Sequence, residues 1–122
     1  MTKPFRLTRP EPLEAQVLKA VLRALELHPL VAKAWRINTG AGKLVRKNGA
    51  SQWINFGVVG GADIWGHMTD GRALYVEVKR PSGDVSPEQN DFIMQAKKVG
   101  CVAFIARSAD DVMTNLMRVK NE

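Results

Sequence analysis

Residues 73–89 read "ALYVEVKRPSGDVSPEQ", and this stretch predicts a strand followed by a helix. Apolar and polar residues alternate from residue 74 to residue 79, which predicts a strand with one buried face. The two faces carry Leu74, Val76 and Val78 on one side and Tyr75, Glu77 and Lys79 on the other. Pro81 and Gly83 end the strand, and the spacing of Ser86 and Gln89 is typical of a capping box that begins a helix.

Outward from this stretch, the pattern predicts an α/β protein with a central mixed β-sheet flanked by helices. The element order expected for the core is α-β-β-β-α-β-α, in one domain covering residues 1–122 with loose ends at 1–8 and 118–122. Helical spacing predicts the first helix from about residue 11 to 26. Asn48-Gly49 predicts a hairpin with a type I′ turn, and the uninterrupted apolar run in "GCVAFIA" predicts a central strand.

The composition is that of a soluble globular protein with an excess of positive charge. The 122 residues include 18 Lys and Arg against 12 Asp and Glu, for a formal net charge of +6. Such an excess favours polyanions, although many basic proteins of this size bind no nucleic acid. One cysteine, no membrane-length apolar run and no secretory signal lead us to expect a cytoplasmic protein that binds no membrane.

Two carboxylates are expected to meet at the end of the quoted strand. The turn at residues 70–71 predicts a hairpin with the preceding strand, so that Asp63 faces Glu77. Two acids side by side, next to Lys79, are costly unless a cation lies between them. Each residue alone has another interpretation, because Glu77 and Lys79 could form an exposed ion pair and Asp63 could cap nearby main chain. Together the three favour a metal site.

Glu14 is a third candidate acid. It precedes Leu18, Val21 and Leu25 by 4, 7 and 11 positions, on the stripe of the first helix that is expected to face the core. A carboxylate on that stripe needs a partner or a metal. The alternative is a position at the edge of the helix, where the side chain reaches water.

Positive side chains gather near the predicted hairpin, with Trp53 and Asn55 on its return strand. Cations beside an aromatic residue suit phosphate contacts and base stacking, although a hairpin that is simply solvated is the alternative. The candidates for DNA contact are Arg36, Asn38, Lys43, Arg46, Lys47 and Arg80.

These features resemble the PD-(D/E)xK nuclease superfamily, and within it the virus-type replication-repair nuclease (VRR-NUC) domain. The segments that carry the resemblance cover roughly residues 11 to 115: "EAQVLKAVLRAL", "AWRINTGAG", "GGADIWG", "LYVEVKRPSGDVSPEQ" and the "GCVAFIA" strand. Ala62 stands where many members of the superfamily have proline, a position that does not contact the metal.

The resemblance implies a restriction-endonuclease-like core and hydrolysis of DNA phosphodiester bonds with Mg²⁺ or Mn²⁺. It implies metal ligation by Asp63, Glu77 and the main-chain carbonyl of Val78, with Glu14 as a further ligand directly or through water. All-oxygen ligation suits these hard ions.

The resemblance also implies that Lys79 orients or deprotonates the attacking water and that Gln89 reaches the site, although capping alone explains a glutamine there. It further implies a homodimer acting in DNA repair on branched DNA such as a four-way (Holliday) junction. The chain length and stand-alone form suggest a phage or prophage origin, and a phage-encoded chain would act in the cytoplasm of the bacterial host. The alternatives are a nuclease of flaps or non-specific DNA and a DNA-binding module without catalysis.

Overall fold

The computed structural model describes residues 10–37, 40–56 and 60–119, except for the side chains of residues 40–44 and 53–56. The elements are α1 (Glu14–Leu27), β1 (Val31–Arg36), β2 (Gly40–Val45), β3 (Ser51–Phe56), β4 (Ile64–Met68), β5 (Ala73–Val78), α2 (Pro87–Lys98), β6 (Val102–Ala106) and α3 (Ala109–Val119). The expected class, a mixed sheet flanked by helices, is confirmed. The full order has five strands before α2 where the expected core order has three, because β2 and β3 form a separate two-stranded sheet. No described helix is long and apolar enough to cross a membrane.

The main sheet has the strand order β1-β4-β5-β6. The β1–β4 and β4–β5 pairs are antiparallel and the β5–β6 pair is parallel. The expectation that β6 is central is therefore wrong for the described sheet, where it lies at one edge. Its apolar run is explained instead by helices α2 and α3, which both contact it.

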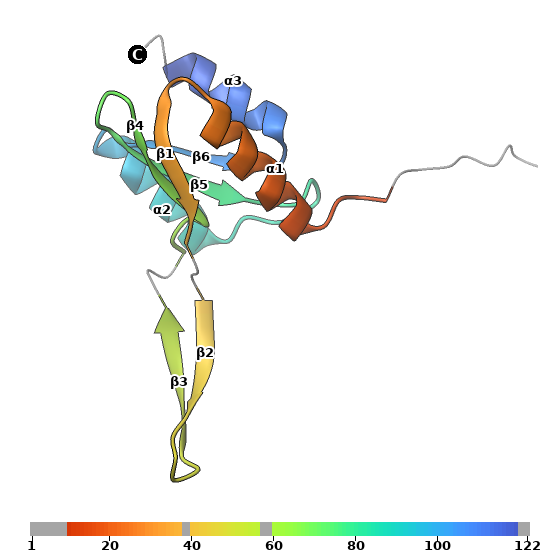
Figure 1. Cartoon of the computed structure of the whole chain (residues 1–122), viewed down its shortest axis with the longest axis vertical. Coiled ribbons are helices and arrows are strands. Elements are labelled where there is room, and N and C mark those ends of the chain that lie inside the picture. Colours follow the sequence, from red (N-terminus) through yellow and green to blue (C-terminus); the bar gives the residue numbers. More distant parts are fainter. Residues whose placement is uncertain (1–9, 38–39, 57–59, 120–122) are drawn as a thin grey trace, which may run out of the picture.

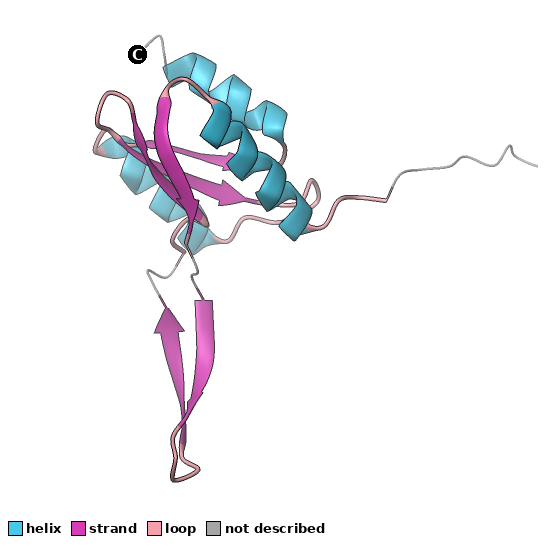
Figure 2. Ribbon diagram, viewed as in Figure 1, coloured by secondary structure: helices cyan, strands magenta, loops and turns pink. Residues whose placement is uncertain are grey.

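The helices make three layers with the sheet (Figures 1 and 2). Helices α1 and α3 contact each other and cover one face, whereas α2 contacts β5 and β6 on the other face. The alternation along β5 follows these layers. Val76 and Val78 belong to the core beneath α1 and α3, and Tyr75 packs with the α2 residues Phe92 and Ile93. Glu77 therefore projects toward the α2 layer.

Two helix ends differ from the expectation. Helix α1 begins at Glu14, three residues later than predicted, with Leu13 N donating to Gln16 Oε1 at 2.9 Å. The ring of Pro12 disfavours helical main chain at Glu11, which explains the later start. Helix α3 extends to Val119, so residues 118 and 119 are helical rather than loose. The other predicted loose residues, 1–8 and 120–122, lie outside the described part of the chain.

The β2–β3 hairpin is present, but its turn is not of type I′. Gly49 has a φ of +84° and no described residue other than glycine has a positive φ, whereas a type I′ turn requires one at both central residues. Arg46 N donates to Ala50 O at 2.8 Å and Gly49 N donates to Arg46 O at 3.0 Å, which makes a three-residue loop closed by a left-handed glycine. Figure 1 shows the hairpin extending away from the main sheet.

Candidate active site

Strands β4 and β5 bring Asp63 beside Glu77. Ile64 pairs with Val76 in antiparallel register, and Asp63 precedes the first residue of this pair while Glu77 follows the second. The Oδ2 atom of Asp63 accepts a hydrogen bond from Val78 N at 2.9 Å. The aspartate carboxylate is thus fixed against the end of β5, next to the glutamate, as the alternation and the turn predict.

Glu77 is the only charged side chain that is buried among the described residues, at 2% exposure. Its Oε1 atom accepts from Gln89 Nε2 at 2.9 Å and lies 4.0 Å from Lys79 Nζ. Its Oε2 atom has no hydrogen-bond partner in the described part of the chain. A buried oxygen without a partner is costly when the carboxyl group is ionised, so in that form a further group at this atom would be stabilising.

The electrostatics of Glu77 agree with this geometry. Burial raises its pKa from 4.5 to about 8, and the charge of Asp63 and a hydrogen bond between the protonated carboxyl of Glu77 and Asp63 add to the rise. Lys79 opposes it, and the charge of Glu14 raises it further. At neutral pH the protein without metal therefore keeps this carboxyl mostly protonated. A divalent cation at the site would favour the ionised form instead, because it supplies the opposite charge.

Gln89 has both of the roles that the sequence left open. Its amide oxygen accepts from Ser86 N at 3.0 Å while its main-chain N donates to Ser86 Oγ at 3.1 Å, which caps α2. Its amide nitrogen is left to donate to Glu77 at 2.9 Å. Capping therefore fixes the amide so that its donor points at the buried acid.

Glu14 does not complete a three-acid cluster. It is the exposed first residue of α1, and the buried stripe of this helix is Val17, Val21 and Leu25. Among the described residues, no three His, Cys, Asp or Glu side chains lie close enough together to hold a metal ion. The exposure of Glu14 agrees with the alternative of an edge position, and its role as a metal ligand, directly or through water, stays a prediction.

A cavity of about 260 Å³ lies between α1 and the ends of β1 and β5. It is lined by Glu14, Ala15, Leu18, Arg36, Ile37, Asp63 and Val78. Glu14 thus faces the same cavity as Asp63 and acts on Glu77 through its charge.

The residues present fit a divalent cation. Asp63 and Glu77 supply hard carboxylate oxygens at adjacent positions, and Glu77 Oε2 has no protein partner in the described structure. Mg²⁺ is commonly held by one or two carboxylates and keeps several of its waters, so a third acid is not required. Val78 lines the cavity together with Asp63, which is compatible with an additional ligand from its main-chain carbonyl.

Two residues that the sequence did not single out hold the segment after β5. Glu11 Oε2 accepts from Arg80 Nη2 and from Ser82 Oγ, both at 2.7 Å. Arg107 Nη1 donates to three main-chain oxygens within residues 80–83, at 2.7, 3.2 and 2.7 Å. Glu11 lies 69 positions from Arg80, so no local pattern could have indicated this contact.

The two candidates for DNA contact near the site, Arg36 and Arg80, differ in whether their charge is already paired within the protein. Arg36 is exposed at the end of β1 and lines the 260 Å³ cavity. Arg80 is paired with Glu11 at 2.7 Å, so its charge is already matched. Arg36 is therefore the better candidate for a phosphate contact at the site.

Three of the other candidates, Lys43, Arg46 and Lys47, belong to the hairpin. Arg46 and Lys47 are exposed at its turn, where Arg46 Nη2 donates to Gln52 Oε1 at 3.3 Å. Lys43 is in β2, but its side chain lies outside the described part, and Asn38 lies outside the described residues altogether.

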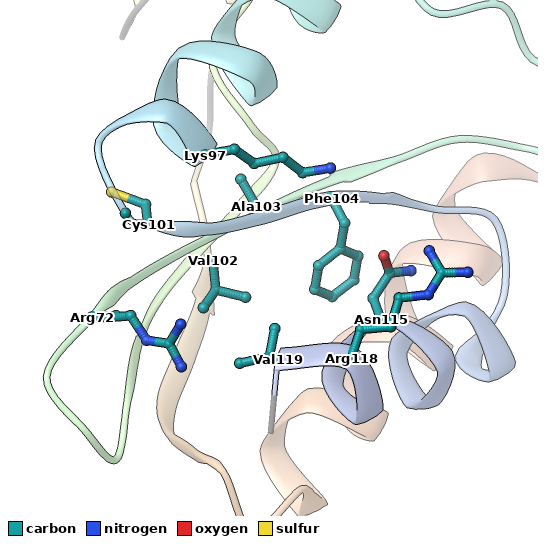
Figure 3. Close-up of a pocket in the computed structure, with 10 residues that line it drawn as sticks. Arg72, Lys97, Cys101, Val102, Ala103, Phe104, Asn115, Arg118 and Val119 are labelled. Carbon is teal, nitrogen blue, oxygen red and sulfur yellow. The ribbon is translucent and has the colours of Figure 1, made fainter. Parts of the chain in front are cut away.

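A second cavity, of about 340 Å³, lies at the opposite ends of the strands (Figure 3). Its lining includes Arg72, Lys97, Asn115 and Arg118, together with Phe104 and the start of β6. The lining has no carboxylate, and the cations belong partly to the last turns of α2 and α3, where positive side chains stabilise helix ends. None of the residues that line it also lines the cavity beside Asp63.

In comparisons with known proteins, no family model matches the chain, and no curated protein or solved structure is significantly similar to it.

Proposed function

We propose that this chain is a Mg²⁺- or Mn²⁺-dependent endonuclease that hydrolyses phosphodiester bonds in DNA, with a restriction-endonuclease-like core of the VRR-NUC type. The observation that carries the proposal is the juxtaposition of Asp63 with Glu77. One oxygen of Glu77 is buried without a described partner, and Lys79 Nζ lies 4.0 Å from the other. Binding alone does not call for two adjacent acids, because they repel phosphate unless a cation is bound.

Asp63, Glu77 and the main-chain carbonyl of Val78 are the groups that would hold the ion. When bound, the ion supplies a water of lowered pKa and stabilises the charge that develops on the phosphate. Hydrolysis adds one water across a P–O bond and leaves a hydroxyl and a phosphate monoester. Gln89 holds one oxygen of Glu77, which leaves the other for the ion. Lys79 would hold the attacking water and offset the growing negative charge.

For the substrate we propose branched DNA, such as a four-way junction, cut by a homodimer. The described residues form one candidate site, and no feature of them indicates a surface for reading base sequence. A twofold pair of sites matches the approximate twofold symmetry of a junction. These parts of the proposal rest on the sequence resemblance and on the symmetry of the substrate.

The test is cleavage of four-way junction, flap and linear DNA with Mg²⁺, Mn²⁺ or EDTA. We expect cutting only when metal is present. The cleavage rate of Lys79→Ala should be lower than that of the wild type by a factor of about 100 or more, while its affinity for DNA is unchanged. Lys98→Ala, which removes an exposed lysine at the far end of α2, is the matched control and should cut normally. Tight binding without cutting under every metal condition would instead identify a non-catalytic DNA-binding module.

A further inference from the structure

The positive charge of this chain is concentrated in one segment. Residues 27–62 contain Lys33, Arg36, Lys43, Arg46 and Lys47 but no aspartate or glutamate. Removing these five from the 18 basic residues leaves 13 against 12 acidic ones, so the rest of the chain is nearly neutral. Nearly all of the net charge that attracts polyanions therefore lies between the end of α1 and Asp63.

The β2–β3 hairpin is the central part of this segment, and it starts and ends at the candidate active site. Arg36 pairs with Ile64 at the end of the β1–β4 ladder, and Ile37 N donates to Asp63 O at 2.7 Å. The chain thus leaves the sheet beside Asp63 and returns there. With about 3.3 Å per strand residue, the six-residue strands β2 and β3 span roughly 20 Å from their open end to the turn.

The turn of the hairpin carries charge that no described acid neutralises. Arg46 and Lys47 are exposed, and the described hydrogen bond of Arg46 goes to the neutral side chain of Gln52. Within the described residues, no ion pair involves the hairpin. Val45 beside them is 65% exposed. A two-stranded sheet on its own is only marginally stable in water, which favours a partner along it.

We infer that the β2–β3 hairpin is a nucleic-acid-binding arm whose turn contacts the phosphate backbone of duplex DNA about one hairpin length, roughly 20 Å or six base pairs, beyond the side of the sheet where Asp63 lies. The inference rests on the proposed function in two respects, namely that the polyanion is DNA and that a bond of this DNA is cut. It adds a substrate requirement, because DNA must extend as a duplex beyond the cleavage point to reach the arm. The arm of a second copy is disfavoured as the partner of this hairpin, since it carries the same positive charge.

The experiment compares two double variants of the full chain. Arg46→Gln/Lys47→Gln removes two charges from the turn, and Lys97→Gln/Lys98→Gln removes two exposed charges from the end of α2. Fluorescence anisotropy with a four-way junction and a linear duplex, in EDTA over a series of salt concentrations, gives the slope of log affinity against log salt. We expect the slope of the arm variant to be shallower than that of the wild type by about 2, because two phosphate contacts are lost. Its affinity for DNA should fall at least about 10-fold. The α2 variant should keep the slope of the wild type to within about 0.5.

The outcomes separate the inference from the proposed function. Equal losses of DNA affinity in the two variants, or an unchanged salt slope in the arm variant, would show that the hairpin is not a DNA-binding arm. A change in solution mass of the arm variant without a change in DNA affinity would also overturn it, and would make the hairpin an interface between copies. If the wild type binds DNA through the arm but cuts no DNA with any metal, the nuclease proposal fails while the binding arm stands. Circular dichroism of both variants checks that the fold is intact.

Discussion

Gln89 donates its side-chain amide to Glu77 across 12 positions of sequence, while the oxygen of the same amide caps the helix on which Gln89 lies. One side chain therefore connects the start of α2 to the buried acid at the end of β5. The capping contact fixes the direction of the donor, so the two roles depend on each other. This connection makes the residue a sensitive point for both stability and the candidate metal site.

Gln89→Ala should lower the free energy of unfolding by about 1 to 3 kcal/mol, because it removes the cap and leaves the buried carboxylate with fewer donors. Denaturant unfolding at pH 7 gives this value. Asn90→Ala, at the exposed neighbouring position, should change stability by less than about 0.5 kcal/mol. Equal stability of Gln89→Ala and the wild type would show that the amide contact contributes nothing.

The protein without metal should lose stability as the pH rises from about 4.5 to 8. The pKa of Glu77 is raised to about 8 in the folded state, from 4.5, so the folded state binds more protons than the unfolded one across this window. Its contribution is complete below about pH 4.5 and is lost as the pH passes through 8. Unfolding free energies in EDTA should fall by roughly 2 to 4 kcal/mol from this group.

Glu77→Gln should remove that part of the pH dependence and should be more stable than the wild type at pH 8 without metal. The amide keeps an oxygen for Gln89 and carries no charge to bury. The comparison uses the same EDTA buffers. A wild-type pH profile that Glu77→Gln leaves unchanged would assign the dependence to another group.

Divalent metal should stabilise the wild type, and the effect should depend on Asp63 and Glu77 more than on Glu14. Mg²⁺ or Mn²⁺ at about ten times its Kd should raise Tm by roughly 3–8 °C. Asp63→Asn and Glu77→Gln should abolish the rise. Glu14→Gln should keep most of it, because the structure brings this residue to the cavity but not into a three-acid cluster. Loss of the rise in Glu14→Gln would restore it as a ligand.

Gly60→Ala should destabilise the protein by about 2 to 4 kcal/mol. Gly60 has a φ of +73°, and an added Cβ would lie 2.6 Å from the main-chain carbonyl of Glu88 at the start of α2. Gly71 is the matched control, because its φ is +94° and nothing lies within 4 Å of an added Cβ. Gly71→Ala should cost only about 1 to 2 kcal/mol, the penalty of left-handed main chain alone. Thermal unfolding of the two variants checks the difference.

The sequence predicted the strands of the site because alternation and a short turn determine them locally. The turn at residues 70–71 sets the register of β4 against β5, and the register alone places Asp63 beside Glu77. Both roles of Gln89, capping α2 and contacting Glu77, could also be predicted, since a capping box fixes where the helix starts.

The rest depended on contacts that no short pattern records. Helical spacing assigned Glu14 to the core stripe, but spacing does not tell where a helix passes the edge of the sheet. The apolar run of β6 indicated burial of both faces and was taken as a central position, although helices covering an edge strand bury it equally well. Glu11 and Arg107 hold residues 80–83 from distant parts of the chain, and only the folded structure brings them together.

The hydrogen bond from Ile37 N to Asp63 O has a consequence for how this protein can vary. It closes the ladder of two neighbouring strands at the point where the hairpin departs, so the central sheet is complete without the hairpin. Lengthening such an excursion twofold costs only about 0.6 kcal/mol in chain entropy. Exchanging residues 40–56 for a shorter or longer segment should therefore change the length of the hairpin while leaving Asp63 and Glu77 in place. In this fold the distance at which DNA is contacted can then vary independently of the candidate active site.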